Sequence, residues 1–303
     1  MTDSGNPRRQ SIIRAKLKGV LPRWVISPVQ ATLKKRRRAR RTRRRLSRPL
    51  LSEDAFRRIL IEDLGLNTGE TVMVHGAMGE LHLDFPFENI LDMLKETVGE
   101  KGTLIFPTYP EKTSHEYLIQ GDIFDVSTTP SGMGLLSEYA RSRPEAIRSL
   151  HPTKSVCALG HRAAEITATH HLSLNPYDLQ SPYQKMMKYG AKVIGLGIFI
   201  HQGLSHLHTV EGARDLVFPA NIYDEHVFRA TCRDSQGHPR IVETRVHRLD
   251  RMRFRIPEFL RDHIPSAICR NLVSHGHPFF WADADKLFHR MMDLARQGIT
   301  MYR

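Results

Sequence analysis

A histidine and a glutamate three positions apart are the first residues in this sequence whose spacing suggests chemistry. His208 and Glu211 follow Ser205, which could cap a helix, so the two side chains would share one helical face. A carboxylate beside an imidazole fixes the tautomer of the ring and raises its basicity, which suits a general base. His-x-x-Glu is also a common incidental pair on helix surfaces, so the spacing alone leaves both interpretations open.

His151 is the second candidate and lies in the sequence Leu-His-Pro-Thr. The following Pro152 favours extended backbone at His151, which predicts a turn between a helix and the strand-like run at 155–159. The ring could take part in catalysis, or it could be a structural histidine that bonds a backbone carbonyl. The sequence around it favours neither interpretation.

Small residues at 128–134, Thr-Thr-Pro-Ser-Gly-Met-Gly, could expose backbone N–H groups at the start of a helix. Such a helix start can bind a phosphate or a polar amide chain. The segment is not a Walker loop, because no Gly-Lys-Ser/Thr ending follows. Pro-Ser-Gly is also an ordinary helix-entry sequence, so a binding role is one of two interpretations.

The 17 histidines make a metal site worth testing. A metal hydrolase could draw its ligands from the histidine-rich segments, namely His161, His170, His171, His206 and His208. However, the sequence contains no HExxH and no CxxC motif, and no Asp/His cluster has a convincing spacing. We therefore expect no metal, and a metal-dependent hydrolase stays an alternative.

The candidate residues follow segments that are typical of buried strands. Strands are predicted at 71–74, 103–107 and 193–200, and amphipathic helices are predicted between the first two and after Ser52. This alternation predicts an α/β fold with a mixed central sheet flanked by helices. In such sheets the loops that follow strands hold the ligands, and His75, Thr108 and the 201–211 segment are such loops.

The length of 303 residues allows one large or two ordinary domains. No run of about 18 apolar residues occurs, so no membrane span is predicted. The three cysteines, Cys157, Cys232 and Cys269, are widely separated and odd in number. They indicate a reducing compartment, and we expect a cytoplasmic protein.

Most of the positive charge lies in an N-terminal extension, predicted to cover residues 1–52. Residues 1–50 hold seventeen Lys and Arg against one acid, whereas the whole chain carries +13, so residues 53–303 are slightly acidic. A short amphipathic helix at 11–29 with Trp24 could lie on an anionic membrane surface, and the Arg-rich run at 34–45 could bind nucleic acid through phosphates. A solvated, partly disordered tail is the alternative.

Seven sequence blocks between residues 53 and 302, in a fixed order, resemble the aminoglycoside 3-N-acetyltransferase family. This family has the antibiotic N-acetyltransferase fold, which differs from the GNAT fold. The matching blocks are Val-His at 74–75, Gly-Thr-Leu-x-x-Pro-Thr at 102–108, Phe-Asp with Thr-Pro-Ser-x-Met-Gly at 124–134, Arg-Ser-x-His-Pro-Thr-x-Ser-Val at 148–156, Ser-Pro-Tyr at 181–183, Ile-Gly-Leu-Gly at 194–197 and Leu-His-x-x-Glu at 207–211. Each block is weak alone, and their shared order makes the resemblance specific.

The resemblance implies transfer of an acetyl group from acetyl-CoA to an amine of an aminoglycoside or amino sugar, with antibiotic resistance as the family's usual role. It implies that His208 is the base, that Glu211 orients it or binds substrate, and that His151 ranks second. It also implies a set of residues that hold the pantetheine and phosphates: His75, Gly76, Ala77, Met78, Thr108, Ser131, Met133 and Gly134.

Two departures from the family pattern affect these expectations. The paired serines of the first turn are Gly76 and Ala77 here, which removes two hydroxyl donors. The loop at 201–206 also differs from the family's Asn-rich sequence, which indicates a different acceptor. A non-catalytic binding module anchored by the basic tail remains the alternative from another class of protein.

Overall fold

The computed structural model describes residues 35–36, 39–213, 215, 217–248 and 250–302. The chain divides into two units, Met1–Arg48 and Pro49–Arg303. In the first unit residues 39–46 are helical, and the amphipathic helix predicted at 11–29 lies outside the described residues. The second unit begins before the predicted boundary at residue 53, because Leu51 is fully buried and its N–H donates to the His82 carbonyl at 2.8 Å.

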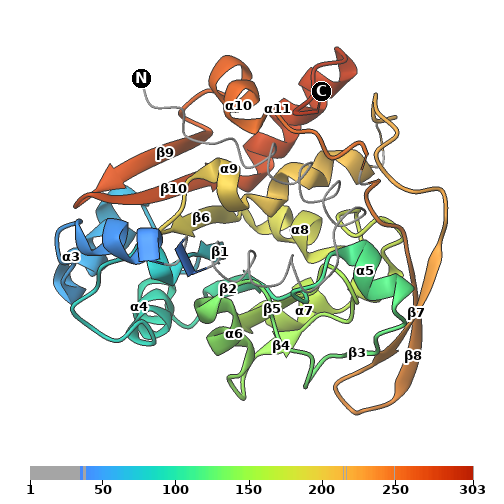
Figure 1. Cartoon of the computed structure of the whole chain (residues 1–303), viewed down its shortest axis with the longest axis horizontal. Coiled ribbons are helices and arrows are strands. Elements are labelled where there is room, and N and C mark those ends of the chain that lie inside the picture. Colours follow the sequence, from blue (N-terminus) through green and yellow to red (C-terminus); the bar gives the residue numbers. More distant parts are fainter. Residues whose placement is uncertain (1–34, 37–38, 214, 216, 249, 303) are drawn as a thin grey trace. The chain divides into compact units, whose positions relative to one another are not determined.

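A mixed sheet of seven strands forms the centre of the second unit, in the order β4-β5-β2-β1-β6-β10-β9 (Figure 1). The three central strands, β2, β1 and β6, are parallel, and the outer strands pair antiparallel. The strands are β1 (Thr71–Gly76), β2 (Thr103–Pro107), β4 (Ile147–Arg148), β5 (Val156–Gly160), β6 (Lys192–Leu196), β9 (Cys269–Ser274) and β10 (His277–Asp283). The predicted class of fold is therefore confirmed.

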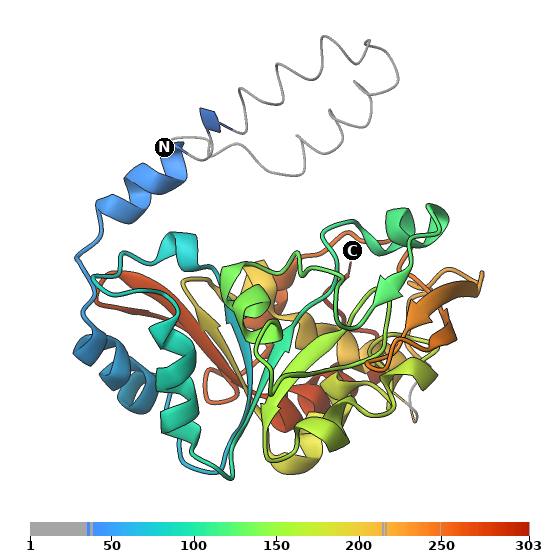
Figure 2. The same cartoon turned by 90° about the horizontal axis from the view of Figure 1, so that it is seen from below.

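Alternating side chains give the sheet an apolar core on each face. In β1, Val72 and Val74 pack into one core, while Met73 between them packs into the other. Helices cover both faces (Figures 1 and 2). The core that contains Val72 and Val74 also holds residues of α3 (Glu53–Arg58), α4 (Asn89–Val98) and α6 (Leu135–Arg141). The core that contains Met73 holds residues of six helices: α7 (Ala163–Thr167), α8 (Pro182–Lys185), α9 (Ile200–Gly203), the 3₁₀ helix η5 (Ser205–Gly212), α10 (Ile256–His263) and α11 (Ala284–Arg296).

A smaller sheet of three strands lies beside the first. It consists of β3 (Phe124–Asp125), β7 (Phe228–Arg233) and β8 (Pro239–Thr244), in the order β3-β7-β8. Its apolar core is small, and Tyr117 of α5 (Ser114–Ile119) contributes to it. The strand predicted at 193–200 ends earlier than expected, at Leu196, because α9 begins at Ile200.

Gly195 of β6 lies directly under the ring of Phe280 of β10, its partner across the sheet. A Cβ at position 195 would come within 2.1 Å of two ring carbons, which is far inside van der Waals contact. We therefore expect Gly195→Ala to lower the free energy of unfolding by about 3 kcal/mol. Urea denaturation followed by circular dichroism measures this change. The double variant Gly195→Ala with Phe280→Leu should recover part of the loss, and an unchanged urea midpoint in the single variant would contradict the packing described.

Candidate active site

Most of the candidate site residues predicted from the sequence lie at the carboxyl ends of the three parallel strands. β1 ends in His75 and Gly76, Thr108 follows β2 directly, and α9 and η5 follow β6. The ends of β1 and β6 are joined, because the N–H of Ala77 donates to the Leu196 carbonyl at 2.8 Å. An α/β sheet holds its ligands at this edge.

Helix η5 brings His208 and Glu211 onto one face. A 3₁₀ helix has three residues per turn, so side chains three positions apart lie one above the other. His208 Nδ1 is 2.7 Å from Glu211 Oε1. The two side chains are thus neighbours, as their spacing predicts, although the helix is 3₁₀ and Ser205 does not cap it. The Ser205 hydroxyl instead lies 3.1 Å from the hydroxyl of Tyr109.

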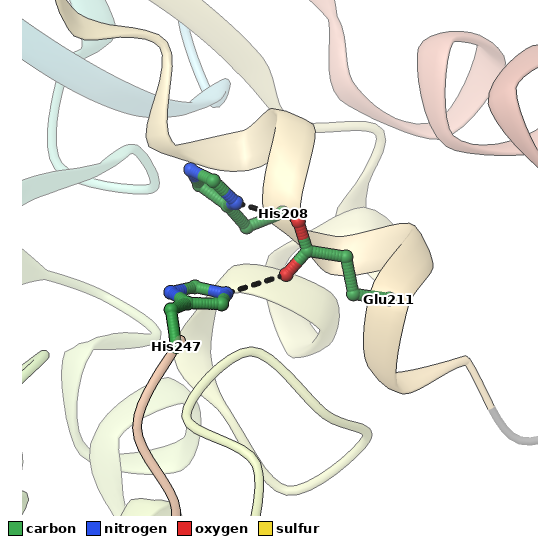
Figure 3. A group of neighbouring side chains, drawn as sticks. All are labelled: His208, Glu211 and His247. Atoms are coloured by element: carbon green, nitrogen blue, oxygen red, sulfur yellow. Dashed lines mark hydrogen bonds and ion pairs between the residues drawn. The ribbon is translucent and has the colours of Figure 1, made fainter. Parts of the chain in front are cut away.

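The carboxylate of Glu211 accepts hydrogen bonds from four side chains, and Figure 3 shows two of them. Oε1 accepts from His208 and from the Tyr302 hydroxyl. Oε2 accepts from His247 Nε2 at 2.7 Å and from the Tyr223 hydroxyl at 3.3 Å. An ionised carboxylate offers about four lone-pair sites, so protein donors fill all of them. Glu211, whose side chain is 0% exposed, is left with no free oxygen for a substrate.

These donors keep Glu211 ionised inside the protein. Burial acts to raise the pKa of Glu211, but the neighbouring charges and hydrogen bonds of His208 and His247 lower it to about 2. Burial lowers the pKa of His247 against the opposing effect of Glu211, so His247 is neutral at pH 7. Burial and then Glu211 raise the pKa of both Tyr302 and Tyr223, which keeps their hydroxyls protonated as donors.

His208 keeps one ring nitrogen free. Because an ionised carboxylate can only accept, Nδ1 of His208 carries the proton and Nε2 carries the lone pair. Nε2 bonds to no residue in the described part of the chain, and the His208 side chain is 16% exposed. An accessible lone pair, with a carboxylate behind it to stabilise the imidazolium, is the arrangement of a general base.

Aromatic rings fix the position of the His208 imidazole. Tyr177 stacks on it with the ring centroids 5.1 Å apart, and Phe254 meets it edge-on at 5.8 Å. His247 lies at 4.9 Å and itself stacks on Tyr223 at 4.6 Å. Contacts on several sides of the ring lock its rotamer, which a preorganised catalytic group requires.

His208, Glu211 and His247 are also the one group of three or more possible metal ligands among the described residues. Ligands bound to one zinc ion at about 2.0–2.2 Å stand about 3 Å or more from each other. Here each imidazole nitrogen lies only 2.7 Å from a carboxylate oxygen, which is a hydrogen-bond distance. With its oxygens already filled by donors, Glu211 fits a hydrogen-bonded network better than a metal centre.

His151 lies in the interior with both ring nitrogens engaged. Nδ1 accepts from the backbone N–H groups of Thr153 at 3.3 Å and Lys154 at 3.1 Å, and Nε2 lies 3.3 Å from the Thr244 hydroxyl. The ring stacks on His170 at 4.3 Å, and burial lowers its pKa well below the usual value. Among the described residues, His151 has no hydrogen bond or ring contact with His208, Glu211 or His247, and its backbone hydrogen bonds hold the turn at 151–155.

The residues predicted to hold the cofactor lie close together. A side-chain carbon at Gly134, the first residue before α6, would come within 3.2 Å of the Gly76 carbonyl oxygen. The N–H of Gly132 donates to the carbonyl of Tyr109, the neighbour of Thr108, at 2.9 Å. The predicted set therefore converges on the ends of β1 and β2. A hollow of about 420 Å³ borders the same segment and is lined in part by residues 129–132.

Two residues of this set have buried polar atoms without a hydrogen-bond partner in the described structure, His75 Nε2 and Thr108 Oγ1. Burial, and then the neighbouring His206, lowers the pKa of His75 to about 3, so its ring is neutral. Buried polar groups in proteins nearly always have a partner, which can be a ligand or an ordered water. Both atoms thus fit a site that is completed by a polar molecule such as pantetheine.

Three residues of this region were not predicted from the sequence: His247, Tyr302 and Lys154. His247 follows β8 in an irregular segment and pairs with Tyr223 in an isolated bridge. Tyr302 is positioned by a bridge to Phe254. No local pattern marks these residues, because each reaches Glu211 or its neighbours from a distant part of the chain.

The structure is thus that of an α/β protein with a hydrogen-bonded pair, His208 and Glu211, at the carboxyl edge of its parallel strands. The family model described as aminoglycoside 3-N-acetyltransferase matches residues 73–293, and the chain belongs to this family. The family predicted from the sequence blocks is thus confirmed.

The chain is similar to aminoglycoside N(3)-acetyltransferase VII of Streptomyces paromomycinus, with 31% identity over 189 residues, which are 57% of this chain and 61% of that protein. It thus spans about three fifths of the length of the curated relatives that it matches. Two solved structures share its fold at 20% identity. They are aminoglycoside acetyltransferase AAC(3)-Xa, with a TM-score of 0.68 over 86% of this chain and 96% of that chain, and AAC-IIIb with CoASH, with a TM-score of 0.67 over 83% and 98%.

Proposed function

We propose that this protein is an acetyl-CoA-dependent N-acetyltransferase that acetylates an amine of an aminoglycoside or amino sugar. The observation that carries the proposal is the imidazole of His208, whose Nδ1–H is held by the ionised Glu211 and whose Nε2 is free. Membership of the family supports the reaction, and the names of its relatives support the class of acceptor.

In the proposed reaction His208 acts as the base. A protonated amine has no lone pair for attack, so the ammonium group first loses one proton to solvent, and during attack the nitrogen loses a second proton to His208 Nε2, while the amide keeps the third. The amine nitrogen bonds to the thioester carbon, the carbon–sulfur bond breaks, and the CoA thiolate leaves and takes a proton. Glu211 stabilises the imidazolium that forms in between, and no covalent enzyme intermediate is required.

Acetyl-CoA is proposed to lie along the ends of β1 and β2 and the start of α6. His75, Thr108, Ser131 and Gly134 would hold its pantetheine and phosphate groups, with Gly76, Ala77, Met78 and Met133 beside them. The buried and unpartnered atoms His75 Nε2 and Thr108 Oγ1 support this placement, since a bound amide chain could satisfy them. Gly76 and Ala77 can offer backbone groups only.

The acceptor is proposed to enter beside His247. A hollow of about 630 Å³ borders this residue and is lined also by Asp224 and Glu225. Carboxylates in such a hollow attract a cationic amine before it reaches the base.

Release of free CoA thiol from acetyl-CoA is the direct test. We expect the purified protein to release thiol when it is given kanamycin, gentamicin or glucosamine, and mass spectrometry should show one added acetyl group on the amine. A metal chelator should leave the rate unchanged. No release with any amine would refute acetyl transfer, and chelator-sensitive hydrolysis would favour a metal hydrolase instead.

The basic N-terminal unit is proposed to bind a polyanion, either an anionic membrane surface or nucleic acid, while the enzyme works in the cytoplasm. The run of Lys and Arg at 34–45 supports this proposal by its charge density. None of the helices in the described part of the chain combines the length and the apolar character needed to cross a membrane.

A further inference from the structure

Lys154 extends from a rigidly held piece of backbone near the proposed base. Its N–H donates to Nδ1 of the buried His151 at 3.1 Å. Its carbonyl accepts from the hydroxyl of Tyr183, a fully buried residue, at 3.3 Å. Hydrogen bonds therefore hold both the N–H and the carbonyl of the Lys154 backbone.

The ammonium of Lys154 lies over the ring of Tyr109, with Nζ 4.4 Å from the ring centroid. The hydroxyl of Tyr109 is bonded to Ser205, which begins the helix that carries His208. Burial lowers the pKa of Lys154 to about 8 against the opposing charge of Glu211, and Lys154 in turn contributes to the lowered pKa of His247. These contacts place a positive charge beside the catalytic group, and the charge is largely present at pH 7.

This ammonium has no partner oxygen in the described structure. It donates no hydrogen bond and forms no ion pair with any described residue, although its side chain is partly exposed. Lys112, by contrast, is paired with Asp122, and Lys192 with Glu70. An ammonium has three donors, and a partly buried charge without a partner is costly, so Lys154 is a group ready to bind an anion.

Two buried or half-buried carboxylates of this region, Glu211 and Asp178, already have other partners. Glu211 already accepts four hydrogen bonds. Asp178 is occupied within its own loop, where it accepts from the Ser173 hydroxyl at 2.8 Å and from the N–H of Gln180 at 3.0 Å. The unpaired charge near His208 is thus positive, and it can pair with an acidic group on the acceptor.

We propose that Lys154 is a specificity-determining residue that binds an acidic group, a phosphate or a carboxylate, on the amine acceptor. This inference rests on the proposed function and predicts that, among its amine acceptors, the enzyme prefers amino sugars that carry an acidic group. Asp224 and Glu225 would face the amine end of such a molecule, while Lys154 holds its acidic end.

A set of matched acceptors tests this proposal: glucosamine, glucosamine 6-phosphate and glucosaminuronic acid, in the thiol-release assay. We expect the wild type to have a higher kcat/KM for an acidic acceptor than for glucosamine. A preference for glucosamine 6-phosphate would indicate a phosphate as the group that Lys154 binds, and a preference for glucosaminuronic acid would indicate a carboxylate. Lys154→Met should lower kcat/KM for the preferred acidic acceptor by about 10- to 100-fold and leave glucosamine within about threefold. Lys154→Arg should keep the preference. Lys188→Met, which removes an exposed lysine, should change neither value.

Calorimetric titration with glucosamine 6-phosphate and glucosaminuronic acid makes the test independent of turnover. Weaker binding of the preferred acid by Lys154→Met than by the wild type supports the proposal, even if no amine releases thiol and acetyl transfer itself is refuted. An equal loss of rate for all acceptors, a wild-type preference for glucosamine, or equal binding by the wild type and Lys154→Met would overturn it.

Discussion

Replacing His208 by alanine is expected to lower kcat for acetyl transfer by about 100- to 10,000-fold, the usual contribution of a general base. The physical reason is that Nε2 of His208 carries a free lone pair, while Nδ1–H is held by the ionised Glu211. The dissociation constant for acetyl-CoA should stay within about threefold of the wild-type value, because the base is needed in the transition state and not for binding. Steady-state thiol release and calorimetric titration with CoA measure the two quantities.

Two further variants separate loss of the base from damage to the fold. His208→Gln keeps an amide that can donate to Glu211 but has no basic nitrogen, so it should be as inactive as the alanine variant while unfolding like the wild type. His289→Ala removes an imidazole that is 67% exposed and should retain full activity. If His208→Gln retained wild-type kcat, His208 would not be the base.

Acid is expected to unfold this protein between about pH 6 and pH 4. Burial lowers the pKa of four histidines: to about 3 for His75 and His170, to about 4 for His206, and well below the usual value for His151. In the unfolded chain each ring takes up a proton near pH 6.5, whereas the folded chain keeps it neutral. Their stabilising contribution is therefore complete above pH 6.5 and is lost as the pH falls below it. Below pH 6.5 each histidine lowers the free energy of unfolding by about 1.4 kcal/mol per pH unit. The four together lower it by roughly 5–6 kcal/mol for each pH unit, against a usual total of about 5–15 kcal/mol.

Urea denaturation at pH 7.5, 6.5, 5.5 and 5.0 measures this dependence. His206→Gln can still donate to the Ala284 carbonyl, which His206 Nε2 contacts at 2.7 Å, but it does not titrate. As the pH falls, the free energy of unfolding of this variant should decrease less steeply than that of the wild type, by about 1.4 kcal/mol per pH unit. His289→Gln, at the surface, should show the wild-type slope. An unfolding free energy that is equal at pH 7.5 and 5.0 would show that these rings are not buried in the neutral form.

The sequence predicts the framework better than it predicts the network around the base. Residues 72–74 and 104–107 are consecutive apolar residues, so the two central strands that contain them are evident from the pattern. The helix after Ser52 is also predicted, and the structure confirms it, with the Ser52 hydroxyl accepting from the N–H of Ala55 at 3.3 Å. The end of β6 at Leu196 was missed, because the apolar run continues through Ile198 into α9 and apolarity alone does not separate a strand from a helix.

The pairing of His208 with Glu211 is local, since three residues of one helix bring them together. The rest of the network depends on contacts over long distances in the sequence. His247 lies 36 positions from Glu211, and Tyr302 lies 91 positions from it. No sequence pattern predicts a role for Lys154, since a single lysine before a strand is common in proteins. Its position becomes evident only in the folded chain, where its ammonium lies over the Tyr109 ring and its carbonyl accepts from Tyr183.

In the proposed enzyme, the hydrogen bonds of the Glu211 carboxylate also make the acetylation rate a measure of complete folding. The donors to this carboxylate come from η5, from Tyr223 before β7, from the segment after β8 and from the stretch that ends at Tyr302, so all four hydrogen bonds form only when these four segments have packed together. A chain whose central sheet is formed but whose residues 299–302 are displaced would have native-like secondary structure and a weakened base. Recovery of acetyl transfer during refolding should therefore lag behind recovery of the circular dichroism signal.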